Sequence, residues 1–271
     1  MRIVITGSSS GIGRALAERL LAHGHQVWGM ARSNQSELAA VHAGTFHATR
    51  CDVAEWPQVE RAAAEISAAW PALDGLVTCA GTQGAVGRAL TTDPARWSAT
   101  VRTDLDGTFH AVRAFHDALR QASRRAKIVC FSGGGATKAR PNFSAYGAAK
   151  TAIVRLVETI AEEECGANLD INAVAPGAIF TRMTEEIIAA CPAAAGEAEY
   201  QAAMRQKAAG SAPLERALDL VEWLLSPASD GISGRLISAV WDSWPTLAGQ
   251  ADALRRSELY TLRRVIPPPP A

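Results

Sequence analysis

A tyrosine and a lysine four residues apart are the first residues in this sequence that could do chemistry. The 271 residues include three tyrosines and four lysines, and only Tyr146 and Lys150 have this spacing. On a helix, residues i and i+4 lie on the same face, one turn apart. A nearby ammonium group favours the phenolate and lowers the pKa of a tyrosine, which is ordinarily about 10. The pair could therefore exchange a proton with a reacting oxygen near neutral pH.

A glycine-rich loop near the N-terminus is the second candidate. The segment Thr6-Gly7-Ser8-Ser9-Ser10-Gly11-Ile12-Gly13 follows an apolar stretch and opens a helical one. Glycines let the backbone approach a pyrophosphate, and a helix N-terminus offers unpaired N–H groups at its positive dipole end. The pattern predicts a dinucleotide site whose contacts are Gly7, Ser9, Ser10, Gly11, Ile12 and Gly13.

Predicted strands and helices alternate along the chain and must position these residues. Short, continuously apolar segments predict strands at 2–6, 26–30, 46–51, 74–79, 127–132, 169–174 and 235–239. Alanine-rich stretches between them predict helices near 11–23, 35–42, 57–69, 94–121, 144–165 and 214–225. Strands without polar alternation are typical of parallel sheets covered on both faces. We therefore expect an α/β fold of the Rossmann type, a doubly wound parallel sheet of about seven strands with helices on both faces.

No linker-like stretch divides the chain, which favours one dinucleotide-binding and catalytic domain over residues 1–244. Residues 182–213 are rich in Ala, Glu and Gly and predict a mobile helical insertion on the substrate side. Residues 245–271 form a C-terminal extension. Its prolines at 267–270 cannot continue a helix, so we expect the last residues to fray.

Composition limits the partners. Lys and Arg number 27, as do Asp and Glu, so the formal net charge is zero. This balance argues against nucleic acid or an anionic membrane, and no stretch has the roughly 20 apolar residues of a membrane span. The chain opens on a strand rather than a signal peptide, and five scattered cysteines without CxxC are typical of a reducing cytoplasm. The six histidines lack metal-ligand spacing, so we expect no metal site.

Taken together, the TGxxxGIG loop at 6–13, the YxxxK pair and Asn172-Ala173-Val174-Ala175-Pro176-Gly177 resemble the short-chain dehydrogenase/reductase family, of the classical type. The resemblance implies that Tyr146 is the acid–base and that Lys150 also binds the nicotinamide ribose. It further implies cofactor contacts from the adenine turn, from the turn after the fourth strand and from the segment after the sixth strand, namely Asp52, Val53, Cys79, Ala80, Gly81, Pro176, Gly177, Ile179 and Thr181.

Three positions depart from the family pattern. Cys79 replaces an asparagine in the turn after the fourth strand. The family's carbonyl-holding serine, thirteen residues before the tyrosine, falls on Gly133. Either the glycine-rich loop bulges and Ser132 takes this role, with Ser144 a lesser candidate, or no serine does. Asp104 occupies the position of the asparagine that holds a relay water, and an ionised aspartate cannot donate a hydrogen bond.

Cofactor choice depends on the end of the second strand. An acidic side chain there would bind the ribose hydroxyls and repel a 2′-phosphate, but the position holds Ala31. Arg32 follows, and a guanidinium can bind a phosphate through two hydrogen bonds. We therefore expect NADP(H) rather than NAD(H).

The sequence thus predicts a cytoplasmic NADP(H)-dependent oxidoreductase that interconverts a ketone and a secondary alcohol, with a small polyhydroxy or sugar-like molecule as the expected substrate. Two alternatives remain: an NADP(H)-binding regulatory or scaffold protein without turnover, and a lyase or epimerase that uses bound cofactor. In the family, helices matching 94–121 and 144–165 pair between subunits, which implies a homodimer or homotetramer. The Trp241–Trp244 segment either lines the substrate site or joins the tail, residues 254–265, to the body.

Overall fold

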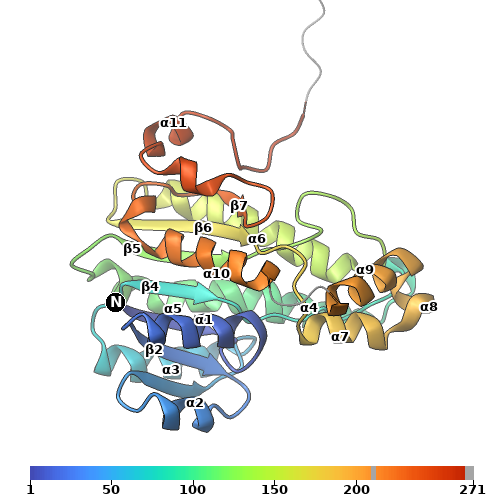
Figure 1. The fold of residues 1–271 in the computed structure, drawn as a ribbon, viewed down its shortest axis with the longest axis horizontal. Coiled ribbons are helices and arrows are strands. Elements are labelled where there is room, and N and C mark those ends of the chain that lie inside the picture. The colour runs from blue at the N-terminus through green and yellow to red at the C-terminus, as the bar shows by residue number, and fades with distance from the viewer. Residues whose placement is uncertain (209–211, 266–271) are drawn as a thin grey trace, which may run out of the picture.

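A seven-stranded parallel sheet lies at the centre of the protein (Figure 1). The computed structural model describes residues 1–208 and 212–265. The strands follow the order β3-β2-β1-β4-β5-β6-β7, and the direction in which the sheet grows reverses between β1 and β4. This confirms the predicted fold class. Strand bounds are β1 (Arg2–Thr6), β2 (Gln26–Ala31), β3 (Phe46–Arg50), β4 (Gly75–Thr78), β5 (Ala126–Phe131), β6 (Leu169–Ala175) and β7 (Leu236–Ser238).

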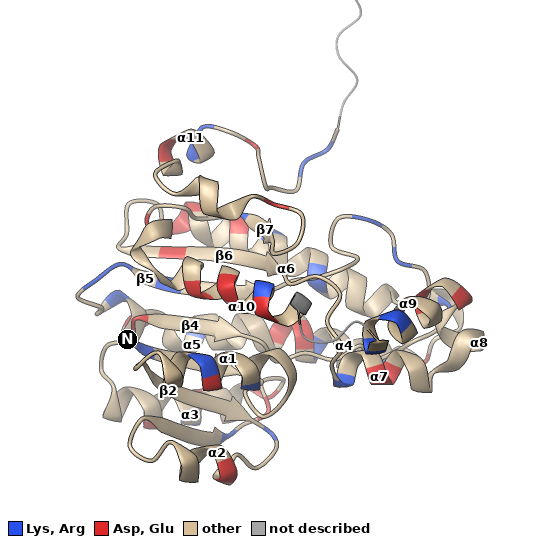
Figure 2. Ribbon diagram, viewed as in Figure 1, with Lys and Arg blue, Asp and Glu red and all other residues tan. Residues whose placement is uncertain are grey.

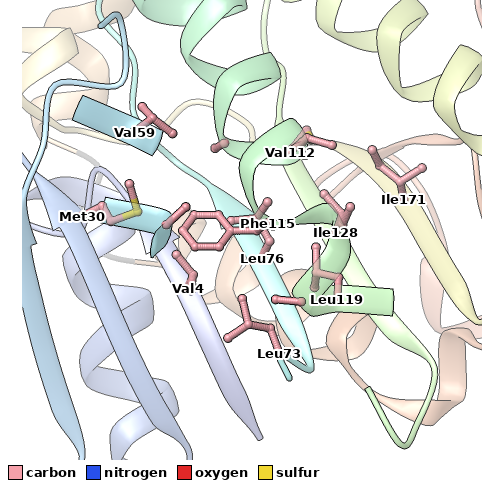
Figure 3. Packing of buried hydrophobic residues seen from close by; sticks show 14 of the residues in the cluster. Val4, Met30, Val59, Leu73, Leu76, Val112, Phe115, Leu119, Ile128 and Ile171 are labelled. Carbon is pink, nitrogen blue, oxygen red and sulfur yellow. The ribbon is translucent and has the colours of Figure 1, made fainter. Parts of the chain in front are cut away.

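Helices cover both faces of the sheet because its strands carry apolar side chains on both. On one face, residues such as Val4, Leu76 and Ile128 pack against α3 and α5, around the buried Phe115 (Figure 3). On the other face, Ile5 and its neighbours pack against α1 and α10. The helices concerned are α1 (Gly11–Ala22), α2 (Ser36–Val41), α3 (Trp56–Ala69), α5 (Gly107–Arg120), α6 (Ser144–Glu163) and α10 (Ala212–Leu225).

Charged residues of both signs are spread over the elements rather than gathered by sign (Figure 2). Some of these charged residues form ion pairs between α1 and α10. Arg19 of α1 pairs with Glu215, Asp219 and Glu222 of α10, at 3.2 Å to Glu215 and 2.7 Å to Glu222. Among the described residues, no helix is long and apolar enough to cross a membrane.

The predicted helix over 94–121 contains an irregular turn. Helix α4 (Pro94–Val101) runs into a π-helical turn, η2 (Arg102–Asp106), and then into α5. A π-turn widens the backbone locally and is common at functional sites. Asp104 lies within η2 and is completely buried. The turn therefore brings a carboxylate inside the protein.

The predicted insertion is helical over the part that the structure describes. It contains α7 (Arg182–Ala189), α8 (Cys191–Ala195) and α9 (Glu197–Ala208), which lie together beyond α4 (Figure 1). Residues 209–211 lie outside the described residues. Ile187, Ala195 and Ala203 pack with Phe143 and Tyr146 in a small apolar cluster. The insertion is thereby connected to the predicted acid–base residue.

The C-terminal extension packs back on the body through η4 (Trp244–Leu247) and α11 (Ala251–Arg255). The ring centroids of Trp244 and Trp223 are 5.7 Å apart, so Trp244 belongs to the hydrophobic layer of α10. Trp241, by contrast, is 86% exposed. This arrangement supports the interpretation that Trp244 joins the C-terminal extension to the body of the protein by hydrophobic packing. The prolines at 267–270 and the expected fraying lie outside the described residues.

One buried arginine holds this extension in place. The Arg235 guanidinium, beside the edge strand β7, donates to the backbone carbonyls of Ser257 (3.1 Å), Leu259 (2.9 Å) and Leu254 (2.6 Å). Leu236 of β7 also donates its backbone N–H to the Tyr260 carbonyl at 2.8 Å. The tail is thus a covering for the free edge of the sheet.

We expect Arg235→Met to lower the free energy of unfolding by about 3 kcal/mol, because the variant keeps the apolar stem but leaves buried carbonyls without a charged donor. Urea denaturation followed by circular dichroism would measure the loss. Arg256→Met is the matched control, since Arg256 is exposed on the same segment. Equal midpoints for the two variants would show that Arg235 does not anchor the tail.

Candidate functional site

A cavity of about 270 Å³ opens at the carboxyl ends of the central strands, next to the β1–β4 reversal. Ligands of doubly wound sheets bind at this kind of position. The predicted cofactor residues that line it are Gly7, Ser9, Ser10, Gly11, Ile12, Gly13, Arg32, Asp52, Val53, Cys79, Ala80, Gly81 and Thr181. Residues separated by more than 170 positions in the sequence thus meet in one place.

The glycine loop packs tightly against the sheet and exposes the start of α1. A Cβ atom on Gly13 would lie 2.4 Å from the carbonyl oxygen of Gly7, and one on Gly7 would lie 2.6 Å from the Ala80 nitrogen. Ser10, the residue before α1, makes no side-chain cap. The N–H groups of the first turn therefore remain available to an anion at the positive end of the helix dipole. This geometry fits a dinucleotide pyrophosphate.

The part of the cavity lining that follows β2 carries a positive charge. Ala31 ends β2 without a carboxylate, and the Arg32 side chain is 67% exposed. One guanidinium nitrogen of Arg32 lies 3.9 Å from a carboxylate oxygen of Asp52, too far for a strong hydrogen bond. Arg32 is therefore held near the cavity while its donors stay accessible.

Tyr146 and Lys150 lie on one buried face of α6. The Lys150 Nζ atom is 5.5 Å from the centre of the Tyr146 ring and donates to the Phe131 carbonyl at 3.1 Å. A Cβ atom on Gly81 would lie 3.5 Å from Nζ, which places the ammonium group beside the cavity lining. The arrangement can hold a phenol and an ammonium group next to a bound nucleotide.

The pKa of Tyr146 shows where spacing alone misleads. Burial raises the pKa of Tyr146, Lys150 opposes this, and Asp104 adds to it; the net direction is upward. The sequence-based expectation of a lowered pKa considered only Lys150. In the structure the loss of hydration outweighs the attraction of the ammonium group. The phenol is therefore protonated at neutral pH and suited to donate a proton.

Ser132 does not lie where a carbonyl-holding hydroxyl is expected. Its hydroxyl is buried and donates to the Lys150 backbone carbonyl at 2.9 Å. The next residue, Gly133, faces the phenol instead, since a Cβ atom there would lie 2.7 Å from the Tyr146 hydroxyl. Adjacent residues of an extended segment point in opposite directions, so the two positions cannot exchange roles. The Ser144 hydroxyl accepts from Trp97 at 3.1 Å.

Asp104 lies directly against this centre. One carboxylate oxygen accepts from the Thr82 N–H at 2.9 Å. The other lies 3.8 Å from the Lys150 Nζ atom, and it is buried without a hydrogen-bond partner in the part of the chain that the structure describes. Burial raises the pKa of Asp104, with Lys150 opposing the change.

The segment after β6 is only partly exposed to the cavity. Thr181 lines it, whereas Pro176, Gly177 and Ile179 are not among its lining residues. Ile179 packs in the core, and a Cβ atom on Gly177 would lie 2.5 Å from the Val240 side chain. Thr181 also caps α7 through a reciprocal pair with Thr184. This segment therefore positions α7 above the cavity.

Helix α7 contributes lining residues that sequence reasoning missed, namely Arg182, Met183 and Glu186. Thr82 and Thr103 also line the cavity. The capping signal Thr181–Thr184 could have located the start of α7, but nothing in the sequence showed that its first turn faces the glycine loop. Over the described residues, no group of three or more His, Cys, Asp or Glu side chains could hold a metal ion.

Comparison with known proteins agrees with this geometry. The family model described as short chain dehydrogenase matches residues 1–192. Galactitol 2-dehydrogenase (L-tagatose-forming) of Cereibacter sphaeroides is 34% identical over 184 residues, 66% of this chain and 72% of that protein. The crystal structure of levodione reductase superposes with a TM-score of 0.77 at 25% identity, covering 93% of this chain and 98% of that chain. An actinorhodin polyketide ketoreductase variant solved with NADPH has a TM-score of 0.76 at 22% identity, over 88% and 94%.

The match to the family model covers most of the chain. The glycine loop, the order of the strands and the helix that carries Tyr146 and Lys150 are all present in one structure. The relatives are named dehydrogenases and reductases, and the family uses nicotinamide cofactors. The chain is therefore a member of the short-chain dehydrogenase/reductase family of oxidoreductases.

Proposed function

We propose that this protein is an NADP(H)-dependent oxidoreductase that interconverts a ketone and a secondary alcohol, with Tyr146 as the acid–base. The observation that carries the proposal is the placement of the Lys150 ammonium group, 5.5 Å from the centre of the Tyr146 ring, beside Gly81 in the lining of the cavity. A nicotinamide bound there supplies or accepts the hydride. The experiment is cofactor-dependent turnover with the purified protein, together with the Tyr146→Phe variant.

Each side chain has a separate task in this proposal. The Tyr146 hydroxyl donates its proton to the carbonyl oxygen during reduction and takes a proton from the alcohol during oxidation. The charge of Lys150 stabilises the phenolate that forms, and its ammonium group binds the nicotinamide ribose. Ser132 acts indirectly: through the Lys150 carbonyl it fixes α6 to the end of β5. No hydroxyl stands at Gly133, so Tyr146 alone orients the substrate oxygen at this side.

The preference for NADP(H) rests on the adenosine end of the cavity. Ala31 offers no carboxylate to the ribose, and the accessible Arg32 guanidinium can bind a 2′-phosphate. We expect Arg32→Ala to raise the KM for NADPH about 10-fold or more, because a charge-assisted pair contributes more than a neutral hydrogen bond. Steady-state kinetics with both cofactors measure this. NADH serves as the internal control, and an equal loss with NADH would contradict the assignment.

We further propose a small polyhydroxy or sugar-like substrate. Polar side chains lie next to Tyr146: the Arg140 guanidinium is 5.5 Å from its ring centre, 2.8 Å from Glu199 and 3.4 Å from Gln83. Such groups can bind hydroxyls, and a similar protein is named a galactitol dehydrogenase. A panel of sugar alcohols against apolar alcohols of equal size tests this; higher kcat/KM for the apolar set would contradict it.

The second candidate function is an NADP(H)-binding regulatory protein without turnover. The absence of a hydroxyl at Gly133, beside the phenol, favours it. Tight NADPH binding without oxidation across a broad carbonyl panel would establish this alternative instead of the enzyme.

A further inference from the structure

The buried carboxylate of Asp104 distinguishes this centre from a pair made only of tyrosine and lysine. Its first oxygen is used to fix Thr82, as an amide oxygen would be. Its second oxygen has no hydrogen-bond partner among the described residues, although it is fully buried. A buried polar atom without a partner is costly, so its retention calls for an explanation in the site that it faces.

The nearest group to that second oxygen is the Lys150 ammonium, at 3.8 Å. Lys150 in turn lies over the Tyr146 ring, so a charge on Asp104 is felt by both members of the pair. The other charged groups around them are Glu186 of α7, which faces Asp104, and Arg140, which faces Tyr146. The thiols near Lys150 are those of Cys79 and Cys130, and burial keeps both in the neutral form.

A negative charge at this position opposes formation of the phenolate, because the two anions repel in a site that excludes water. It also offsets part of the attraction that Lys150 exerts on the phenolate. A neutral asparagine would keep the bond to Thr82 and lose both effects. The charge, rather than the shape, is therefore what aspartate adds.

We propose that Asp104, in its carboxylate form, is a positioning residue which keeps the Tyr146–Lys150 pair in the proton-donating form, the form that ketone reduction uses. The proposal rests on the proposed function of Tyr146. It assigns Asp104 a role through the pair and not through contact with the substrate.

The test is a spectroscopic pH titration of the tyrosines, which requires no turnover. The chain has three tyrosines, so the difference between wild type and Tyr146→Phe isolates the absorbance of the Tyr146 phenolate. We expect Asp104→Asn to move this titration about 1 pH unit towards acid. Asp104→Ala is the second neutral variant and should move it in the same direction.

Asp106→Asn is the matched control, because it removes the same charge from the same π-helical turn, two residues away. It should leave the Tyr146 titration in place. In assays of turnover by Asp104→Asn, the rise of the alcohol-oxidation rate with pH should shift towards acid by the same amount as the Tyr146 titration. An unchanged or more alkaline titration in both Asp104 variants would overturn the proposal, while absent turnover with a shifted titration would count against the proposed function alone.

Discussion

Replacing Tyr146 with phenylalanine is expected to lower kcat by about 10³-fold, because in the proposed mechanism the Tyr146 hydroxyl exchanges the proton with the substrate oxygen. The ring remains, so its packing with Phe143 and Ile187 in the apolar cluster should persist. NADPH binding, followed by fluorescence titration, should stay within about twofold of wild type. Tyr260→Phe, on the C-terminal extension, is the matched control. Activity that survives in the Tyr146 variant would remove this residue from the mechanism.

The direction of the Tyr146 pKa also predicts the pH dependence of the two reactions. Burial raises the pKa of Tyr146 above its ordinary value of about 10. Ketone reduction needs the protonated phenol, so its rate should be level through neutral pH and fall only as the phenol ionises in strongly alkaline solution. Alcohol oxidation needs the phenolate and should rise over the same alkaline range. A reduction rate that already falls between pH 6 and 8 would contradict this assignment.

The second large effect is expected from Gly13→Ala. In a helix, alanine is favoured over glycine by about 1 kcal/mol, so propensity alone predicts stabilisation. The added Cβ atom, however, would lie 2.4 Å from the Gly7 carbonyl oxygen and 2.9 Å from its carbonyl carbon. Backbone atoms cannot rotate away, so α1 must shift from the sheet. We expect a net loss of about 3 kcal/mol in the free energy of unfolding.

The same shift moves the first turn of α1 out of line with the pyrophosphate, so NADPH affinity should fall together with stability. Urea denaturation and NADPH titration measure the two effects separately. Gly134→Ala is the control, because a Cβ atom there would meet no other described residue within 4 Å. If Gly13→Ala behaves like this control in both measurements, the loop does not pack as described.

The sequence was sufficient for the fold because its signals are local. Continuous apolar segments and alanine-rich stretches located every strand to within about two residues of its observed bounds. The glycine loop and the i, i+4 spacing of Tyr146 and Lys150 depend on neighbouring residues alone, and both lie where they were expected.

Side-chain direction and burial, by contrast, depend on distant parts of the chain. Adjacent backbone positions point in opposite directions, and the packing of this segment places Gly133, not Ser132, towards the phenol. The π-turn that buries Asp104 beside Lys150 interrupts a segment whose composition predicts one uniform helix.

Sequence by itself therefore determined the sheet, the glycine loop and the placement of Tyr146 and Lys150 on one helix face, since each follows from short-range spacing. Only the tertiary structure decided the direction in which the pKa of Tyr146 moves. Burial removes water from Tyr146, and the desolvation cost outweighs the charge of Lys150, which is the one effect visible in the spacing. The pKa of a buried side chain depends on all the groups that pack around it, including those from distant parts of the sequence.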